Sequence, residues 1–431
     1  MDRNRKTKRK GPGLNSVRVR LSKSFVGQEE ADAVARVVLD SGFFGLGKEV
    51  KAFEDELAAY IGNGREVACT SAATSALHLA LQACGIGEGD EVLAPTITYV
   101  ATYQAISATG ARPVSCEVRE SDCWLDLEDA EARITPRTKA IVVVHYASGC
   151  GDLDALYDLA RRYNLRVIED AAHAFGCTYK GNRIGSIGDV VCFSFQGTKN
   201  ITSGEGGAVV TADPAVAQRI RDLRLLDVLN DSDNRYAGKR SWEFDVNEQG
   251  WRYHMSDLMA AIGRVQLRRF EHEMMPRRVE LGTRYQELLA GAEHVRMLNI
   301  CFGEVVPHIF PIYVTNGRRD EIRSALAERG IETGIHYKPN HLLTMYGNAE
   351  EHFPVAERLF DEMLTLPLHP GLTEAHQDEV VEVVRSFAAF PSQSARSVAA
   401  LTLDLEAPAA PPVSKPRTPR KRGAARKVVT A

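Results

Sequence analysis

The residues that flank Lys199 predict that its side chain is at least partly buried. It follows the apolar stretch "VVCFSF", which predicts a buried strand, and precedes "SGEGG", whose glycines allow close backbone packing. Desolvation lowers the pKa of a lysine amine, and the neutral amine is a nucleophile that forms Schiff bases with carbonyl carbons. The alternative for Lys199 is an ordinary solvated surface charge.

Other polar residues stand at the ends of predicted elements. Thr74 and Ser75 begin the apolar helix of "TSAATSALHLAL", where hydroxyl groups cap a helix or its free amides hold a phosphate. Tyr99 follows the apolar run "DEVLAPTIT", and Asp170 ends the run "RVIED". Taken alone, each has an ordinary structural explanation, such as a hydrogen-bonded carboxylate. Together with Lys199 they supply what pyridoxal phosphate needs: a phosphate cradle, an aromatic face, an acid for the pyridine nitrogen and a lysine for the aldehyde.

The segments that carry these residues alternate between strand and helix patterns from about residue 26 to residue 211. Strands that are apolar throughout are typical of a parallel sheet covered on both faces. Side chains at the ends of such strands face one crevice, so the pattern predicts an α/β domain with a mainly parallel sheet. The predicted strands are 90–98, 112–118, 140–146, 166–170 and 190–195, and the predicted helices are 71–85, 99–110 and 153–164.

The pattern changes after the glycine-rich turn. Residues 256–291 form a long amphipathic helical stretch, and the segments after it suggest a smaller α+β unit. From Pro391 onward the sequence is rich in Ser, Ala and Pro and then in basic residues, which predicts disorder. We therefore expect four regions: a basic N-terminal tail (1–24), a large cofactor-binding domain (25–265), a small C-terminal α+β domain (266–390) and a disordered basic tail (391–431).

The composition excludes several classes of protein. The chain has 431 residues, 44% hydrophobic and 26% charged, and no apolar run approaches the roughly 20 residues that span a bilayer. Membrane insertion is not expected, and without an apolar secretory signal core we expect a cytoplasmic protein. Both ends of the chain are rich in basic residues, a composition typical of solvated tails, so we do not expect nucleic-acid binding. We also expect catalysis not to need these tails.

The sequence contains no typical metal site. The eight cysteines are scattered singly, and His336, His341 and His369 match no metal-ligand spacing, so no metal is expected.

From about Phe25 to Phe390 the chain resembles the DegT/DnrJ/StrS family of PLP-dependent nucleotide-sugar aminotransferases. The resemblance implies the type I PLP-dependent aminotransferase fold. Eight stretches in one order carry it: "GFFGLGKEVKAFEDELAAYIG", "TSAATSALHLAL", "GDEVLAPTITYVAT", "VIEDAAHAFG", "FSFQGTKNITSGEGG", "YHMSDLMAAIGRVQL", "GIHYKPNH" and "LPLHP".

The resemblance also implies roles for individual residues. Lys199 would bond to the cofactor aldehyde and then move protons, while Asp170 would pair with the pyridine nitrogen. His173 would lie near the ring's phenolic oxygen, and Tyr99 would stack on the ring. The other implied contacts are Thr74, Ser75 and Ser194 to the phosphate, and His336 and Tyr337 near the sugar-nucleotide site.

One position departs from the family pattern. Where many members read "GYNYRM", this chain reads "GWRYHM" and has Arg252 in place of the asparagine that reaches the phosphate of the neighbouring subunit's cofactor. An arginine can bind phosphate through its fork of donors, so a homodimer with shared sites is expected. The alternatives are that Arg252 marks a substrate phosphate or pairs with an acidic neighbour on its own surface.

The implied reaction moves an amino group from glutamate to a keto group of a nucleotide-linked sugar. The loop "TSGEGG" resembles that of members that aminate C4. One alternative is the same chemistry on a keto-cyclitol or another non-nucleotide keto compound. Another is a non-catalytic regulatory protein with the same fold.

Overall fold

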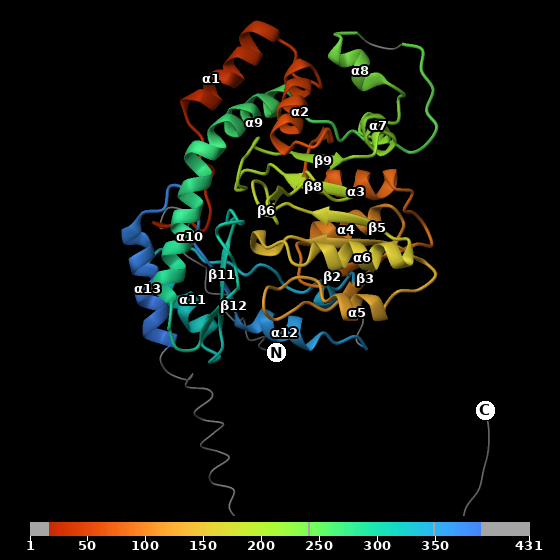
Figure 1. Ribbon diagram of the computed structural model, residues 1–431. Helices are drawn as coiled ribbons and strands as arrows, with labels where there is room; N and C mark the ends of the chain where they lie inside the picture. The colour runs from red at the N-terminus through yellow and green to blue at the C-terminus, as the bar shows by residue number, and fades with distance from the viewer. Residues whose placement is uncertain (1–16, 240–241, 348–349, 389–431) are drawn as a thin grey trace, which may run out of the picture. The chain divides into compact units, whose positions relative to one another are not determined.

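The computed structural model describes residues 17–239, 242–347 and 350–388. Within them, a seven-stranded sheet has the order β1-β9-β8-β5-β4-β2-β3 (Figure 1). All neighbouring pairs are parallel except the two made by β9, which runs antiparallel to β8 and β1. The predicted mainly parallel sheet is thus confirmed. Its strands are β1 (Glu66–Thr70), β2 (Glu91–Pro95), β3 (Arg112–Cys116), β4 (Thr138–Val144), β5 (Arg166–Asp170), β8 (Val190–Ser194) and β9 (Gly207–Thr211).

Helices cover both faces of this sheet. In β8, Val190 and Cys192 pack into one apolar cluster with α3, α4 and α7, and Val191 and Phe193 pack into another with α2, α6 and α9. This alternation explains why the strand is apolar at every position. The described α-helices outside the small sheet's cluster are α1 (Gln28–Arg36), α2 (Lys48–Ile61), α3 (Ala73–Ala83), α4 (Val100–Ala108), α5 (Leu127–Ala132), α6 (Leu153–Tyr163), α7 (Pro214–Leu223), α8 (Asp231–Tyr236), α9 (Asp257–Arg269) and α12 (Pro354–Glu362), of which α1 packs on α9 and α12 on β11.

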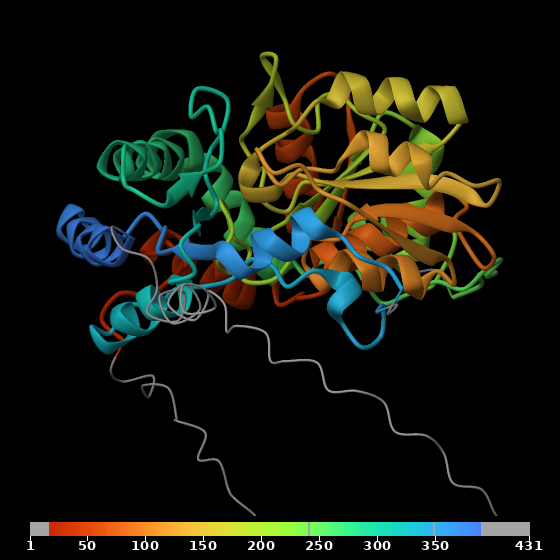
Figure 2. The same ribbon diagram turned by 90° about the horizontal axis from the view of Figure 1, so that it is seen from below.

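A second, antiparallel sheet follows later in the chain, in the order β10-β11-β12. Its helices lie at the end of the molecule away from α5 and α6, as Figure 2 shows. Apolar side chains of α10, α11 and α13 join those of β11 and β12 in a separate cluster. The elements are α10 (Met275–Leu289), β10 (Val295–Met297), β11 (Phe310–Val314), α11 (Arg319–Glu328), β12 (Met363–Leu366) and α13 (Glu374–Ala388), and a two-stranded ribbon, β6 (Thr178–Tyr179) and β7 (Asn182–Arg183), stands apart from both sheets.

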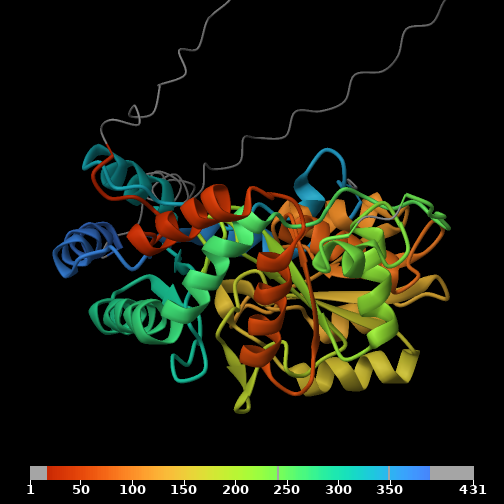
Figure 3. The ribbon, with the colours of Figure 1, turned by 90° about the horizontal axis from the view of Figure 1, so that it is seen from above.

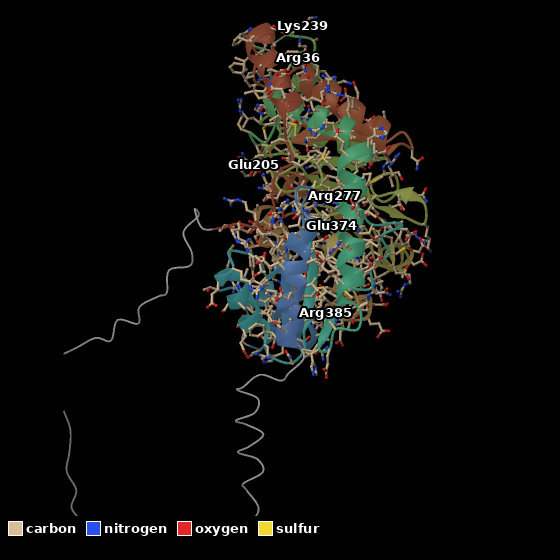
Figure 4. The ribbon with its side chains drawn as sticks, turned by 90° about the vertical axis from the view of Figure 1, so that its left-hand side faces the viewer. Arg36, Glu205, Lys239, Arg277, Glu374 and Arg385 are labelled. Carbon is tan, nitrogen blue, oxygen red and sulfur yellow. The ribbon has the colours of Figure 1, made fainter. Side chains whose placement is uncertain are left out.

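The long helical stretch predicted for residues 256–291 is α9 and α10, joined by a π-helical turn at Phe270–Met274. Seen from above, α1 and α2 lie beside α9 (Figure 3), and α10 packs against α13 (Figure 4). The expected boundary at residues 265 and 266 falls inside α9 and stays a prediction. Among the described residues, no helix is long and apolar enough to cross a membrane.

Packing begins before the predicted end of the N-terminal tail. Val19 is buried in the cluster of the small sheet, and its backbone pairs with Ile331. Leu368 donates its backbone N–H to the carbonyl of Leu21, and Ser24 donates its hydroxyl to the carbonyl of Gly197. The other predicted tail residues, 1–16 and 391–431, lie outside the described residues.

A truncation series tests the packing of this segment. A chain that starts at residue 25 is expected to unfold at a lower temperature than one that starts at residue 17, because it loses the burial of Val19. Burying a valine side chain contributes about 1.5–3 kcal/mol, and the lost backbone pairing adds to this. Thermal unfolding of the two chains measures the difference, and equal melting temperatures would show that the segment contributes nothing.

Candidate active site

Most of the polar residues predicted to work together line one cavity of about 480 Å³. This volume lies within the roughly 300–1,000 Å³ of small-molecule sites. Ser75 and Arg252 do not line the cavity. The predicted residues that do are Thr74, Tyr99, Asp170, His173, Ser194, Lys199, His336 and Tyr337.

The parallel strands explain how these side chains come together. Asp170 is the last residue of β5, and Ser194 is the last residue of the neighbouring β8. Tyr99 stands directly before α4, shortly after β2 ends. Because β2, β5 and β8 run in the same direction, their carboxyl ends open onto one edge of the sheet, where ligand crevices form in α/β folds.

Lys199 follows β8 and stands partly exposed in the cavity wall. Burial of its amine lowers the pKa of Lys199 to about 8; the nearby Asp170 carboxylate opposes this shift, and Arg278 adds to it. Above that pH the amine is neutral and carries the lone pair needed to attack a carbonyl carbon. The surroundings of Lys199 thus favour the neutral amine, as its sequence position predicts.

Asp170 is buried, with only 6% of its surface exposed. It accepts a hydrogen bond from Thr102 Oγ1 at 2.8 Å and another from the backbone N–H of Ala172 at 3.2 Å. Burial raises the pKa of Asp170, while these bonds and the positive charge of Lys199 act against that rise. A carboxylate accepts up to about four hydrogen bonds, so Asp170 can take a protonated ring nitrogen as a further partner.

The N-terminal end of α3 lies where the phosphate cradle was predicted. Ala72, Ala73 and Thr74 line the cavity where the first amides of the helix are free of intrahelical partners. Gly207 in β9 allows this end to pack closely, because a Cβ there would lie 2.7 Å from the Ala72 carbonyl. The Ser75 hydroxyl accepts from the Ala72 amide and donates to the Ala72 carbonyl, so it caps the helix. A phosphate contact by Ser75 stays a prediction.

Aromatic and imidazole rings form the other side of the cavity. Tyr99 is 58% exposed, and its ring lies 5.5 Å from that of Tyr337. The Tyr337 hydroxyl is 3.1 Å from His173 Nε2, and His336 Nδ1 is 2.9 Å from Thr365 Oγ1. Burial lowers the pKa of His173 well below its usual value and that of His336 to about 4. Both imidazoles are therefore neutral near pH 7.

Arg252 lies outside the cavity and is exposed. Its backbone bridges to Leu225, and the carbonyl of Tyr253 accepts the N–H of Ser71, just before α3. Within the described residues the Arg252 side chain makes no ion pair, and its role stays a prediction.

Sequence patterns did not single out several residues in or beside the cavity. Thr102 does not line the cavity but bonds to Asp170, and it lies one helical turn after Tyr99, so the helix period could have placed it beside the site. His308 precedes β11 of the other sheet, and only the tertiary fold brings it to Lys199. Gln196 and Thr198 flank the turn after β8, and the exposed Glu205, labelled in Figure 4, comes from the loop before β9.

The residues present fit pyridoxal phosphate. The cavity joins helix-end amides for an anion, a carboxyl with spare acceptor capacity, an aromatic ring and a lysine amine whose pKa is lowered to about 8. These are the contacts that this cofactor requires of a protein.

Comparisons with known proteins agree with this chemistry. The model of the DegT/DnrJ/EryC1/StrS aminotransferase family matches residues 26–385. The spore coat polysaccharide biosynthesis protein SpsC of Bacillus subtilis is 39% identical over 373 residues, which are 84% of this chain and 94% of that protein.

Solved structures of aminotransferases also share the fold. DesV of S. venezuelae is 38% identical with a TM-score of 0.77, over 85% of this chain and 95% of that one. The PLP form of the putative sugar aminotransferase Spr1654 from Streptococcus pneumoniae is 30% identical with a TM-score of 0.78, over 86% of this chain and 98% of that one. The type I aminotransferase fold is thereby confirmed, and the cofactor is pyridoxal phosphate. The chain belongs to the DegT/DnrJ/EryC1/StrS aminotransferase family.

Proposed function

We propose that this enzyme moves an amino group from glutamate to a keto group of a nucleotide-linked sugar, with C4 as the favoured position. The observation that carries the proposal is the partly buried amine of Lys199 in a cavity that also holds the Asp170 carboxyl and the open end of α3. The sugar class is supported by the relatives, since Spr1654 is described as a putative sugar aminotransferase and SpsC as a polysaccharide biosynthesis protein.

Four residues of the cavity and the amides of α3 have defined tasks in this reaction. When bound, pyridoxal phosphate bonds through its aldehyde to amines and withdraws electrons from the adjacent carbon. Lys199 anchors the group, and its freed amine takes the proton from Cα of glutamate. In the second half of the reaction, the same Nζ returns a proton to the sugar carbon that receives the nitrogen. Asp170 holds a proton on the pyridine nitrogen, and the α3 amides with Thr74 and Ser194 fix the phosphate.

A substrate panel tests the proposal. With glutamate as donor, we expect turnover of a nucleotide-linked 4-keto sugar to exceed that of a 3-keto sugar and of the corresponding keto sugar without a nucleotide, measured as 2-oxoglutarate formed. Preference for a 3-keto sugar would overturn the C4 assignment. A keto-cyclitol used better than any nucleotide-linked sugar would overturn the substrate class.

We further propose a homodimer in the cytoplasm. Large exposed apolar side chains occur around α2 and α8, including Leu39, Phe44 and Phe244, and Arg252 is exposed without an ion pair among the described residues. Exposed apolar surface favours a protein contact. Arg252 would then reach the cofactor phosphate of the other subunit. All eight cysteines are free, which favours a reducing compartment.

Mixing two inactive variants tests the shared site. Lys199→Ala and Arg252→Ala are each expected to have little activity as homodimers. In a mixed dimer one site carries both changes and the other carries neither, so activity is expected to return to about a quarter of wild type for random pairing. Absence of recovery despite demonstrated subunit exchange, or full activity of Arg252→Ala alone, would contradict the shared site.

A further inference from the structure

His308 contacts the amine of Lys199 from the part of the chain that forms the small sheet. Its Nε2 lies 3.4 Å from Lys199 Nζ. Within the part of the chain that the structure describes, Nζ makes no ion pair, and this imidazole is its one hydrogen-bond partner. A protonated amine has no lone pair and can only donate. Whenever Lys199 carries the proton, His308 Nε2 must therefore accept the bond.

The backbone around His308 fixes the position of its ring. The hydroxyl of Ser148 accepts the N–H of His308 at 3.0 Å and donates to the carbonyl of His173. Ser148 is fully buried with a φ of 73°, a left-handed conformation that non-glycine residues rarely adopt. One hydroxyl thus connects the chain segments that carry the two imidazoles, whose ring centres lie 4.5 Å apart.

The His308 imidazole is in the neutral state that a hydrogen-bond acceptor requires. Burial lowers the pKa of His308 well below its usual value, and the neighbouring Lys199, His173, Arg278 and His336 lower it further. The ring is therefore neutral near pH 7 and keeps a lone pair. Of the two ring nitrogens, Nδ1 has no hydrogen-bond partner among the described residues, so Nε2 is the one engaged.

We propose that His308 is a positioning residue, whose Nε2 accepts a hydrogen bond from Lys199 Nζ and holds that amine in place after it has taken the substrate's proton. The inference rests on the proposed role of Lys199 as the base. Without the imidazole, the protonated amine loses its acceptor and the freed side chain loses its orientation, so proton transfer slows.

The test measures the amine itself, in protein freed of cofactor. The rate of acetylation of Lys199 by acetic anhydride, read by peptide mass spectrometry across pH, gives its pKa, because only the neutral amine reacts. The groups that face this amine are Asp170, which raises its pKa, Arg278, which lowers it, and the neutral imidazoles of His173, His308 and His336. For the wild type the reaction should rise with pH through a midpoint near 8.

Three variants separate the acceptor from the bulk of the ring. His308→Leu and His308→Asn place no acceptor at the Nε2 position, whereas the longer His308→Gln does. We expect the first two to lower the Lys199 midpoint by about one unit, a tenfold loss of proton affinity, and the third to keep it near the wild-type value. In the loaded enzyme, kcat for the glutamate half-reaction should fall about tenfold in the first two and recover in the third.

The matched control is His341→Gln, which replaces another buried histidine, bonded to Thr96 and Glu357 away from the cavity. It should leave the Lys199 midpoint unchanged. An unchanged midpoint in His308→Leu and His308→Asn, or a shift in His308→Gln as large as in His308→Asn, would overturn the proposal. If His308→Leu fails to fold, the Asn and Gln pair decides alone. Borohydride trapping of cofactor on a lysine other than Lys199 would instead overturn the proposed function.

Discussion

Replacing Lys199 with alanine should lower amino transfer by at least about a thousandfold. The variant loses both the covalent anchor for the cofactor and the base that moves the proton, and general-base catalysis alone is worth about 10²–10⁴. The folded state should survive, because the desolvated amine costs free energy where it lies. Rates of the glutamate half-reaction and a thermal melt of the cofactor-free protein measure the two effects.

A control and a labelling experiment accompany this variant. Lys180→Ala removes an exposed lysine that is paired with Asp154 and should leave the rate unchanged. Borohydride should abolish the visible absorption of the wild-type protein and leave the cofactor attached to the peptide that contains Lys199. Retention of near-normal turnover by Lys199→Ala would rule out its assigned role.

Replacing Asp170 with asparagine should slow the reaction by about a hundredfold or more while the fold is kept. Asparagine has nearly the same shape and keeps one oxygen, which can accept one of the two bonds that Thr102 and the Ala172 N–H give to separate carboxylate oxygens, but it carries no negative charge. Without that charge the pyridine nitrogen loses its proton and withdraws electrons less strongly. The half-reaction with glutamate, followed by absorbance, measures the loss.

The neighbouring threonine provides a graded comparison. Thr102→Val removes one hydrogen bond to the Asp170 carboxylate but keeps its charge, so its effect on the half-reaction should be much smaller. A near-normal rate in Asp170→Asn, or equal losses in both variants, would show that the charge of Asp170 is not what the reaction uses.

The residues nearest the sheet were the ones that the sequence could predict. Asp170 and Ser194 end strands, so the polarity of a parallel sheet places them at one edge without further information. Lys199 could be singled out because an apolar strand and a glycine-rich turn flank it in the chain. The hydrophobic pattern of a short segment shows where a strand ends, and this is enough to place a residue that directly follows the strand.

Contacts between distant segments could not be predicted in this way. His308 lies 109 positions from Lys199, and its approach depends on how the small sheet packs near the large one. The antiparallel orientation of β9 could not be predicted either, because an apolar strand has the same hydrophobic pattern in a parallel and in an antiparallel sheet. The sequence could not decide whether the Ser75 hydroxyl binds phosphate or caps α3. A hydroxyl at the start of a helix can do either, and the choice depends on the direction of its side chain.

The pairing of Val19 with Ile331 also constrains the order in which the chain assembles. During synthesis the N-terminal segment emerges first, yet its partner strand edge does not exist until more than three hundred further residues have been made. Domains generally fold as they leave the ribosome, N-terminal portions first. The large sheet, complete once β9 has emerged, can therefore form early, while Val19 and Leu21 remain without their later partners. Closure of the small sheet around Val19 is then a late event, because the chain must first be made as far as Ile331.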